Sequence, residues 1–309
     1  MKNDNLTGTI ILICIIGILL LGGTKGKEST FAPNPPAEMQ TSPTIPVAVN
    51  PSVSWPSVTW TSQGSLGGNI NDPNQPSQPT KEEIEKNYSP YYNLIDLSFI
   101  SRSPNPNQEY AVIRVTGNLP SPIRVTGWTI RSSETGVSVE IPKGAYLYFS
   151  NSPNYEEDIY LVSLDTLYLI TGTSPIGVSF RTNKCIGYLS QFQNFLPGLY
   201  TNCPIPRNEN LSSIPRSPNN DACLDYIESF PACRIQTQSL PVSWSYECTN
   251  FIYSKINYPS CVNTHKSDKD FYGQEWRVYL KRSEKLWKEK RERIVLYDEN
   301  RKIVDWVSY

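Results

Sequence analysis

The stretch that most constrains the fold runs from Glu109 to Ser132 and reads EYAVIRVTGNLPSPIRVTGWTIRS. In its first half, apolar side chains recur at every second position, which is the period of a half-buried strand. The recurring residues are Ala111, Ile113 and Val115. A proline-rich loop follows, so the pattern predicts two strands joined by this loop.

The second half of this stretch breaks the alternation at a glycine. Val125 and Trp128 are three residues apart, so in an unbroken strand they would face opposite sides of the sheet. Gly127 lies between them. A glycine at such a break predicts a β-bulge, which would turn Trp128 into the core. We therefore expect four residues of this strand pair in the core, namely Ile113, Val115, Trp128 and Ile130.

Short alternating runs separated by turn-rich stretches continue along the chain. We expect further strands at 93–101, 145–149, 159–162, 167–170, 178–181, 276–280, 293–297 and 302–309. Short strands at such spacing favour an all-β sandwich.

The order of several motifs resembles the lamin-tail domain family. The motifs are Glu-Tyr-x-x-Ile at 109–113, Val-Thr-Gly-Trp-Thr-Ile at 125–130, Ile-Pro-Lys-Gly at 141–144, and a closing hairpin at 294–305. The resemblance covers 87–183 and 271–309, and it implies an immunoglobulin-like β-sandwich. The family usually has glycine in the turn of the closing hairpin, where this chain has Asn300 and Arg301. No coiled-coil rod precedes the domain, so only the fold is carried over.

The N-terminal region, 1–27, contains an uncharged apolar run of 18 residues at 6–23. That length just spans a bilayer core of about 30 Å. A cleaved signal peptide is the alternative, but Gly22-x-Thr24 matches its cleavage site poorly. We expect an uncleaved transmembrane helix that anchors the chain to the cell membrane.

Residues 28–86 read as a linker. Ten prolines lie between 31 and 80, among many Ser, Thr, Asn and Gln residues. Such a segment buries too little apolar surface to offset its ordering entropy, so we expect a disordered tether. As a flexible coil it would span about 40 Å. Trp55 and Trp60 are unusual in this setting and are either a partner-binding motif or isolated aromatic residues.

Residues 184–270 differ in composition from the strands before and after them and hold six cysteines, so we expect a disulfide-rich, partly helical insertion within the sandwich. They are Cys185, Cys203, Cys223, Cys233, Cys248 and Cys261. An even number of cysteines beyond an apolar N-terminal segment predicts three disulfides in an oxidising compartment. A zinc site would require closer pairs of cysteines. Six cysteines allow 15 pairings, and the sequence does not choose between them. We expect helices here at 222–230, capped by Asp221, and at 241–256.

Charge and the remaining polar clusters give few functional leads. The net charge of −1 argues against a nucleic-acid partner. His265, Asp268 and Asp270 either form part of a metal site or lie in a solvated loop. The basic run at 281–293 either grips an anionic polymer or forms a solvated face paired with its own Glu residues. Asp305 lies in the closing hairpin and is expected to be structural.

Nineteen tyrosines raise the question of a glycan-binding surface. The tyrosines considered for it are Tyr88, Tyr91, Tyr92, Tyr246, Tyr253 and Tyr258. Tyrosine is enriched at binding surfaces, but it also fills β-sandwich cores. The chain has no G-x-S-x-G, Walker or H-E-x-x-H motif.

These patterns together predict a single-pass membrane protein whose domain lies outside the cytoplasm. We expect it to bind or adhere to a protein or glycan at the cell surface, without catalysis, cofactor or metal. The alternative is a glycan-directed enzyme or an accessory carbohydrate-binding protein of the cell envelope.

Overall fold

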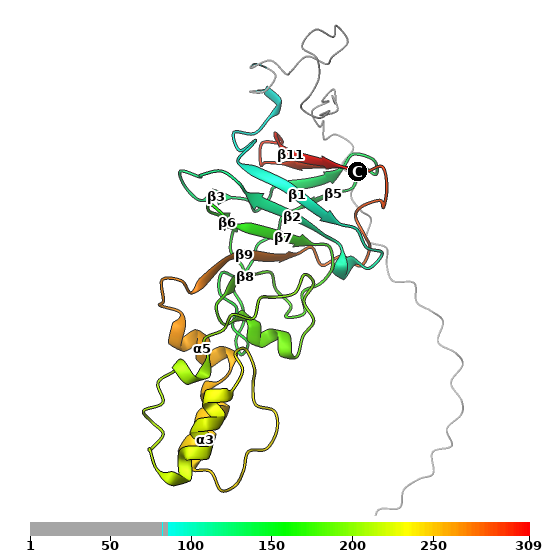
Figure 1. Cartoon of the computed structure of the whole chain (residues 1–309). Helices are drawn as coiled ribbons and strands as arrows, with labels where there is room; N and C mark the ends of the chain where they lie inside the picture. Colours follow the sequence, from blue (N-terminus) through cyan, green and yellow to red (C-terminus); the bar gives the residue numbers. More distant parts are fainter. Residues whose placement is uncertain (1–81, 83–85) are drawn as a thin grey trace, which may run out of the picture. The chain divides into compact units, whose positions relative to one another are not determined.

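The computed structural model of this 309-residue chain describes residue 82 and residues 86–309 (Figure 1). The anchor expected at 1–27 and nearly all of the linker at 28–86, with Trp55 and Trp60, lie outside the described residues. In the described part, no helix has the length and apolar character needed to cross a membrane. This part consists mostly of β-sheet, with short helices and three disulfides.

One sheet has five strands in the order β1-β2-β7-β9-β8 (Figure 1). Its strands are β1 (Ile95–Ser101), β2 (Tyr110–Val115), β7 (Thr166–Ile170), β8 (Phe180–Asn183) and β9 (Tyr272–Tyr279). Neighbouring strands are antiparallel except β7 and β9, which pair in parallel. β8 and β9 are adjacent in the sheet although the whole cysteine-rich segment separates them along the chain. That segment therefore enters and leaves at one edge of the sheet.

The second sheet has four strands in the order β11-β10-β4-β5. They are β4 (Thr129–Ser132), β5 (Ser138–Glu140), β10 (Arg293–Tyr297) and β11 (Ile303–Ser308). β10 and β11 form the expected closing hairpin, and Arg301 takes a φ of 61° in its turn. This left-handed conformation favours glycine, and here an arginine adopts it. β3 (Ile123–Arg124) and β6 (Tyr160–Leu161) form a separate two-stranded ribbon.

The β-bulge predicted at Gly127 is wrong. A turn separates β3 from β4 there, with the Trp128 N–H donating to the Val125 carbonyl at 3.0 Å. Gly127 has a φ of 86°, which glycine adopts without strain. The turn carries the chain from the ribbon to the four-stranded sheet, so the predicted second strand is two short strands. The strand expected at 145–149 is also wrong, because Ala145 makes only an isolated bridge to Phe180.

The apolar core between the two sheets draws side chains from both of them and from the ribbon. Trp128 lies in it with no exposed surface, and its indole N–H donates to the Glu299 carboxylate at 2.7 Å. Its ring also stacks on Tyr91, with 5.5 Å between centroids. The structure buries all four residues expected in the core, namely Ile113, Val115, Trp128 and Ile130.

Asp305 joins the edges of the two sheets. Its carboxylate in β11 accepts the Leu97 N–H of β1 at 2.7 Å. Burial is the main cause that raises the pKa of Asp305 to about 6; the Leu97 N–H opposes this rise, and the neighbouring Asp96 carboxyl contributes to it. A single carboxyl thus supplies a hydrogen bond between edge strands.

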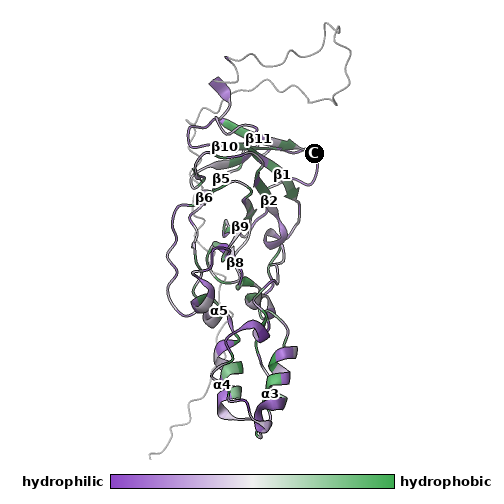
Figure 2. Cartoon of the chain, turned by 60° about the vertical axis from the view of Figure 1, so that its left-hand side comes forward, coloured by the Kyte–Doolittle hydropathy of each residue, from purple (hydrophilic) through white to green (hydrophobic). Residues whose placement is uncertain are grey.

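Three α-helices lie in the segment expected to be partly helical. They are α3 (Pro218–Ser229), α4 (Tyr246–Lys255) and α5 (Tyr258–His265). Figure 2 shows α3 and α4 side by side, each with polar and apolar residues along its ribbon. Three short 3-10 helices are η1 (Pro106–Gln108), η2 (Ile186–Gln191) and η3 (Pro206–Asn208).

The helix boundaries differ from the expected ones. α3 begins at Pro218 after Ser217, so Asp221 lies in its first turn and does not cap it. α4 begins at Tyr246, where the Ser245 hydroxyl caps it by accepting the Cys248 N–H at 3.3 Å. α5 was not predicted.

A second apolar cluster surrounds these helices. It also contains Ile170, Phe180 and Tyr279 of the five-stranded sheet. The cysteine-rich segment therefore packs on the sheet rather than standing apart from it.

Candidate functional site

Three disulfides link the six expected cysteines, in the pairs Cys185–Cys261, Cys203–Cys233 and Cys223–Cys248. The first joins the chain after β8 to α5, and the third joins α3 to α4. All six side chains are buried. The disulfides therefore hold together the segments that form the first of two hollows beside α5.

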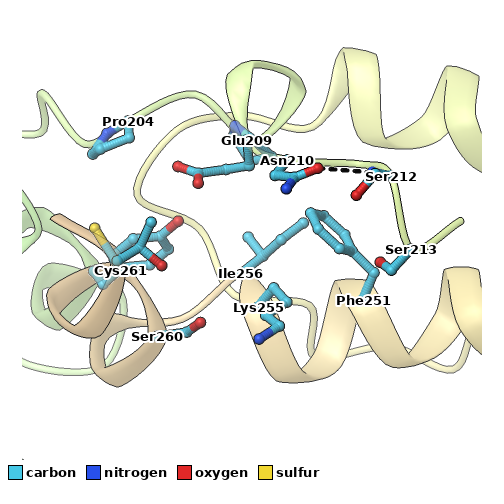
Figure 3. A pocket seen from close by; sticks show the side chains of 13 residues that line it. Pro204, Glu209, Asn210, Ser212, Ser213, Phe251, Lys255, Ile256, Ser260 and Cys261 are labelled. Carbon is cyan, nitrogen blue, oxygen red and sulfur yellow. Dashed lines mark hydrogen bonds between the residues drawn. The ribbon is translucent and has the colours of Figure 1, made fainter.

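The first hollow, the α4–α5 pocket, has a volume of about 270 Å³ (Figure 3). Its apolar floor is Tyr188, Pro204, Pro206, Phe251, Ile256 and Cys261. Its polar rim is Glu209, Asn210, Ser212, Ser213, Lys255, Ser260 and Thr264. Figure 3 shows Glu209 and Asn210 facing Phe251 and Ile256 across the hollow.

Burial, with a smaller contribution from the charge of Glu209, raises the pKa of Tyr188 to about 12. The Tyr188 hydroxyl on this floor is therefore neutral at physiological pH.

His265 holds the Glu209 loop against the end of α5. One ring nitrogen, Nε2, lies 2.8 Å from the Glu209 carboxylate, and the other, Nδ1, lies 2.9 Å from Asp268. Lys184 pairs with Asp268 at 3.0 Å and with Asp270 at 2.7 Å. Burial alone would lower the pKa of His265, but its two carboxylate partners raise it above the usual value.

The structure thus brings His265, Asp268 and Asp270 together as an ion-pair network. Glu209 and Lys184, which complete the network, gave no sequence signal because they are distant along the chain. In the described part of the chain, no three or more His, Cys, Asp or Glu side chains are grouped to hold a metal ion.

The second hollow, the Phe149 pocket, lies between the loop after Ala145 and the start of α5. Its volume is about 240 Å³, and it is lined by Tyr148, Phe149, Ser150, Asn151, Ser152, Tyr258, Pro259, Val262 and Asn263. Tyr258 donates its hydroxyl to the Tyr148 carbonyl at 2.9 Å and so ties the loop to the helix. Burial raises the pKa of both tyrosines.

Phe149 is the exposed aromatic residue of this pocket, with 44% of its surface accessible. Asn154 holds its backbone from both sides, accepting the Phe149 N–H at 2.7 Å and donating to its carbonyl at 2.9 Å. These two hydrogen bonds therefore fix the backbone of the loop at Phe149, whose ring is exposed. The sequence predicted Phe149 at the end of a strand and gave no sign that it lies in a loop with an exposed ring.

The basic run at 281–293 has a structural role. Leu286 and Trp287 within it are buried, and their N–H groups donate to the buried Glu109 carboxylate at 2.7 and 3.1 Å. A second buried carboxylate, Glu292, accepts the Lys288 N–H at 3.2 Å. This run was expected to grip a polymer or to form a solvated face, yet its centre is packed into the domain.

The six tyrosines considered for a glycan surface do not gather in one place. Tyr91 stacks on Trp128, and Tyr258 is buried as the first residue of α5. Tyr88 and Tyr92 pack near Trp306 in β11. Tyr246 and Tyr253 are exposed on α4.

Both hollows have the chemistry of binding sites. An apolar floor with a few convergent polar groups is the usual form of a small-molecule site. Each hollow is below the roughly 300–1,000 Å³ of drug-sized pockets, so each has room for one ring-sized group. Both ring nitrogens of His265 face carboxylates, so neither is directed at a serine of the nearby rim. Comparisons with family models, curated proteins and solved structures found no match to this chain.

Proposed function

We propose that this protein is a membrane-anchored, extracytoplasmic binding module that holds one ring of a carbohydrate in the Phe149 pocket. The apolar run at 6–23 would supply the anchor, and the proline-rich linker would hold the domain away from the membrane. The disulfides support a location outside the cytoplasm, because they form and persist in oxidising compartments. No catalytic step is part of this proposal.

The exposed Phe149 ring beside amide and hydroxyl groups is the observation that carries the ligand class. One face of a sugar ring presents C–H groups, which pack favourably on the electron-rich face of an aromatic ring. Asn151, Asn263 and the two serines of the same pocket offer donors and acceptors for the hydroxyl groups of the sugar. An aromatic face with such neighbours fits a sugar better than it fits a peptide strand or an anion.

For the β-rich part, we propose an immunoglobulin-like sandwich of the lamin-tail type. The two sheets around one core and the closing β10–β11 hairpin support this assignment. The cysteine-rich segment is then an insertion between two adjacent strands, and it supplies one wall of the binding pocket.

Binding of the intact detergent-solubilised chain to a glycan array, followed by calorimetry with the best glycan, tests the proposal. Phe149→Ala should weaken binding at least tenfold, because it removes the stacking surface. Phe192→Ala is the matched control, since Phe192 is 63% exposed and lies outside the pocket. Absence of any glycan ligand, or equal affinity in Phe149→Ala, would refute the carbohydrate assignment.

A further inference from the structure

The described residues contain two Asn-x-Ser sequons, at 87–89 and 210–212. This pattern is the acceptor for N-linked glycosylation, and it marks surface loops of exported proteins. The two sequons have different surroundings, so the structure distinguishes between them.

The 210–212 sequon lies in an exposed loop just after η3. Asn210 and Ser212 are both exposed. The Asn210 side-chain oxygen accepts the Ser212 N–H at 3.0 Å, drawn as the dashed line in Figure 3. This Asx-turn brings the hydroxyl-bearing residue back toward the asparagine side chain. Both residues needed for modification are therefore at the surface and close together.

The 87–89 sequon is folded into the domain. Ser89 is 5% exposed, its hydroxyl accepts the Tyr91 N–H at 3.2 Å, and its N–H donates to the Ile303 carbonyl at 2.8 Å. Tyr88 forms a bridge with the same Ile303. A transferase acting on the folded protein would reach Asn210 and would not reach this serine.

We infer that Asn210 is an N-glycosylation site, an inference that rests on the proposed extracytoplasmic location. The donor is an oligosaccharide linked through phosphate to a polyprenyl lipid, used by a membrane oligosaccharyltransferase. The amide nitrogen Nδ2 attacks C1 of the first sugar and forms an N–C bond. The bond between C1 and the phosphate oxygen breaks, the lipid phosphate leaves, and a base of the transferase takes one Nδ2 proton.

The position of Asn210 gives the glycan a structural consequence. Asn210 lines the α4–α5 pocket, so an attached sugar lies over the opening of that pocket. The apolar floor made by Phe251 and Ile256 is then shielded from solvent. The Phe149 pocket is lined by other residues and stays open for an external ligand.

Mass spectrometry of the full chain purified from its native cells tests this inference. Trypsin cuts after Arg207 and Arg216, so the peptide 208–216 carries this sequon alone. The peptide should carry a glycan in the natural chain and in Ser212→Thr. It should be unmodified in Asn210→Gln and Ser212→Ala. Asn208→Gln changes an exposed asparagine outside the sequon and should leave the glycan in place.

The state of the cysteines in the same samples separates the two proposals. A fully unmodified 208–216 peptide together with three disulfides would overturn glycosylation and leave the extracytoplasmic location standing. An unmodified peptide together with six free thiols would overturn both. A glycan on Asn87 alone would also overturn the assignment of Asn210.

Discussion

Removal of the Cys223–Cys248 disulfide should loosen α3 and α4 while the β-sheets stay folded. The two cysteines are 25 residues apart, and both side chains are buried. A loop of this length stabilises by about 3.5 kcal/mol when only the entropy of the unfolded chain is counted. The other two disulfides already restrict the same part of the unfolded chain. We therefore expect Cys223→Ala/Cys248→Ala to cost about 2–3.5 kcal/mol.

The loss should be local because the disulfide joins two helices of the second apolar cluster. The core between the sheets has no cysteine among its members. Hydrogen exchange of the full chain, measured peptide by peptide, tests this directly. Exchange should accelerate in α3 and α4, whereas β2 and β7, inside the five-stranded sheet, should keep their protection.

Cys14→Ala is the matched control, because Cys14 is the one cysteine outside the six that pair. It should change neither exchange nor the free energy of unfolding. Equal loss of protection in β2 and in α3 would refute the reasoning, because it would mean that one cooperative unit spans both apolar clusters. A destabilisation below about 1 kcal/mol would also refute it, because the disulfide would then contribute far less than loop closure requires.

Three further predictions follow from individual side chains. Trp128→Ala should destabilise the protein by about 3–5 kcal/mol in urea titrations, because it empties a fully buried site; an unchanged midpoint would contradict this. The raised pKa of Asp305 means that the folded chain holds a proton which the unfolded chain has released between about pH 4 and 6, so stability should fall as pH rises through that window. Solvent screening keeps this effect near 1 kcal/mol, and Asp305→Asn should abolish it. His265 is the single histidine, so its NMR resonance can be followed on its own and should report a pKa above the usual value. The stabilisation by its charge should be present below about pH 6.5 and should disappear as pH rises through the raised pKa. A pKa below the usual value would exclude its pairing with Glu209.

The β-rich part was largely predictable because strand alternation is a local property. The positions of β2, β7 and β10 follow from apolar residues at every second position. This pattern does not depend on which strands are neighbours in the sheet. The turn at Gly127 was not predictable in this way. Whether a glycine at a parity break makes a bulge or a turn depends on the strands that pair on either side of it. Two of those strands, β6 and β10, are distant along the chain, and only β5 is near.

The candidate sites were less predictable than the fold. The cysteine pairing requires the packing of α3 to α5, and no local pattern encodes it. Both hollows join residues that are distant in sequence, as Tyr148 and Tyr258 do in the Phe149 pocket. The partners of the buried Glu109 carboxylate were also not predictable. They are the N–H groups of Leu286 and Trp287, which lie in a highly charged run far along the chain from Glu109.

The strand β9 explains how one sheet supports two apolar clusters. Trp276 and Val278 face the core between the sheets, whereas Tyr279 faces the cysteine-rich segment. Arg277 faces that segment as well, and its guanidinium donates to the carbonyls of Pro197 and Gly198 at 2.7 and 2.9 Å.

The two ends of the segment are also held together where β8 and β9 pair, and there the Lys184 N–H donates to the Phe271 carbonyl at 2.9 Å. An insertion whose ends are already adjacent in a sheet adds little loop-closure cost to the domain that carries it. The sheet can therefore tolerate change in the loops and helices around both pockets as long as the outward face of β9 stays complementary to the inserted segment. Substitutions at Arg277 should for this reason disturb the pockets more than substitutions at the exposed residues of α3 or α4.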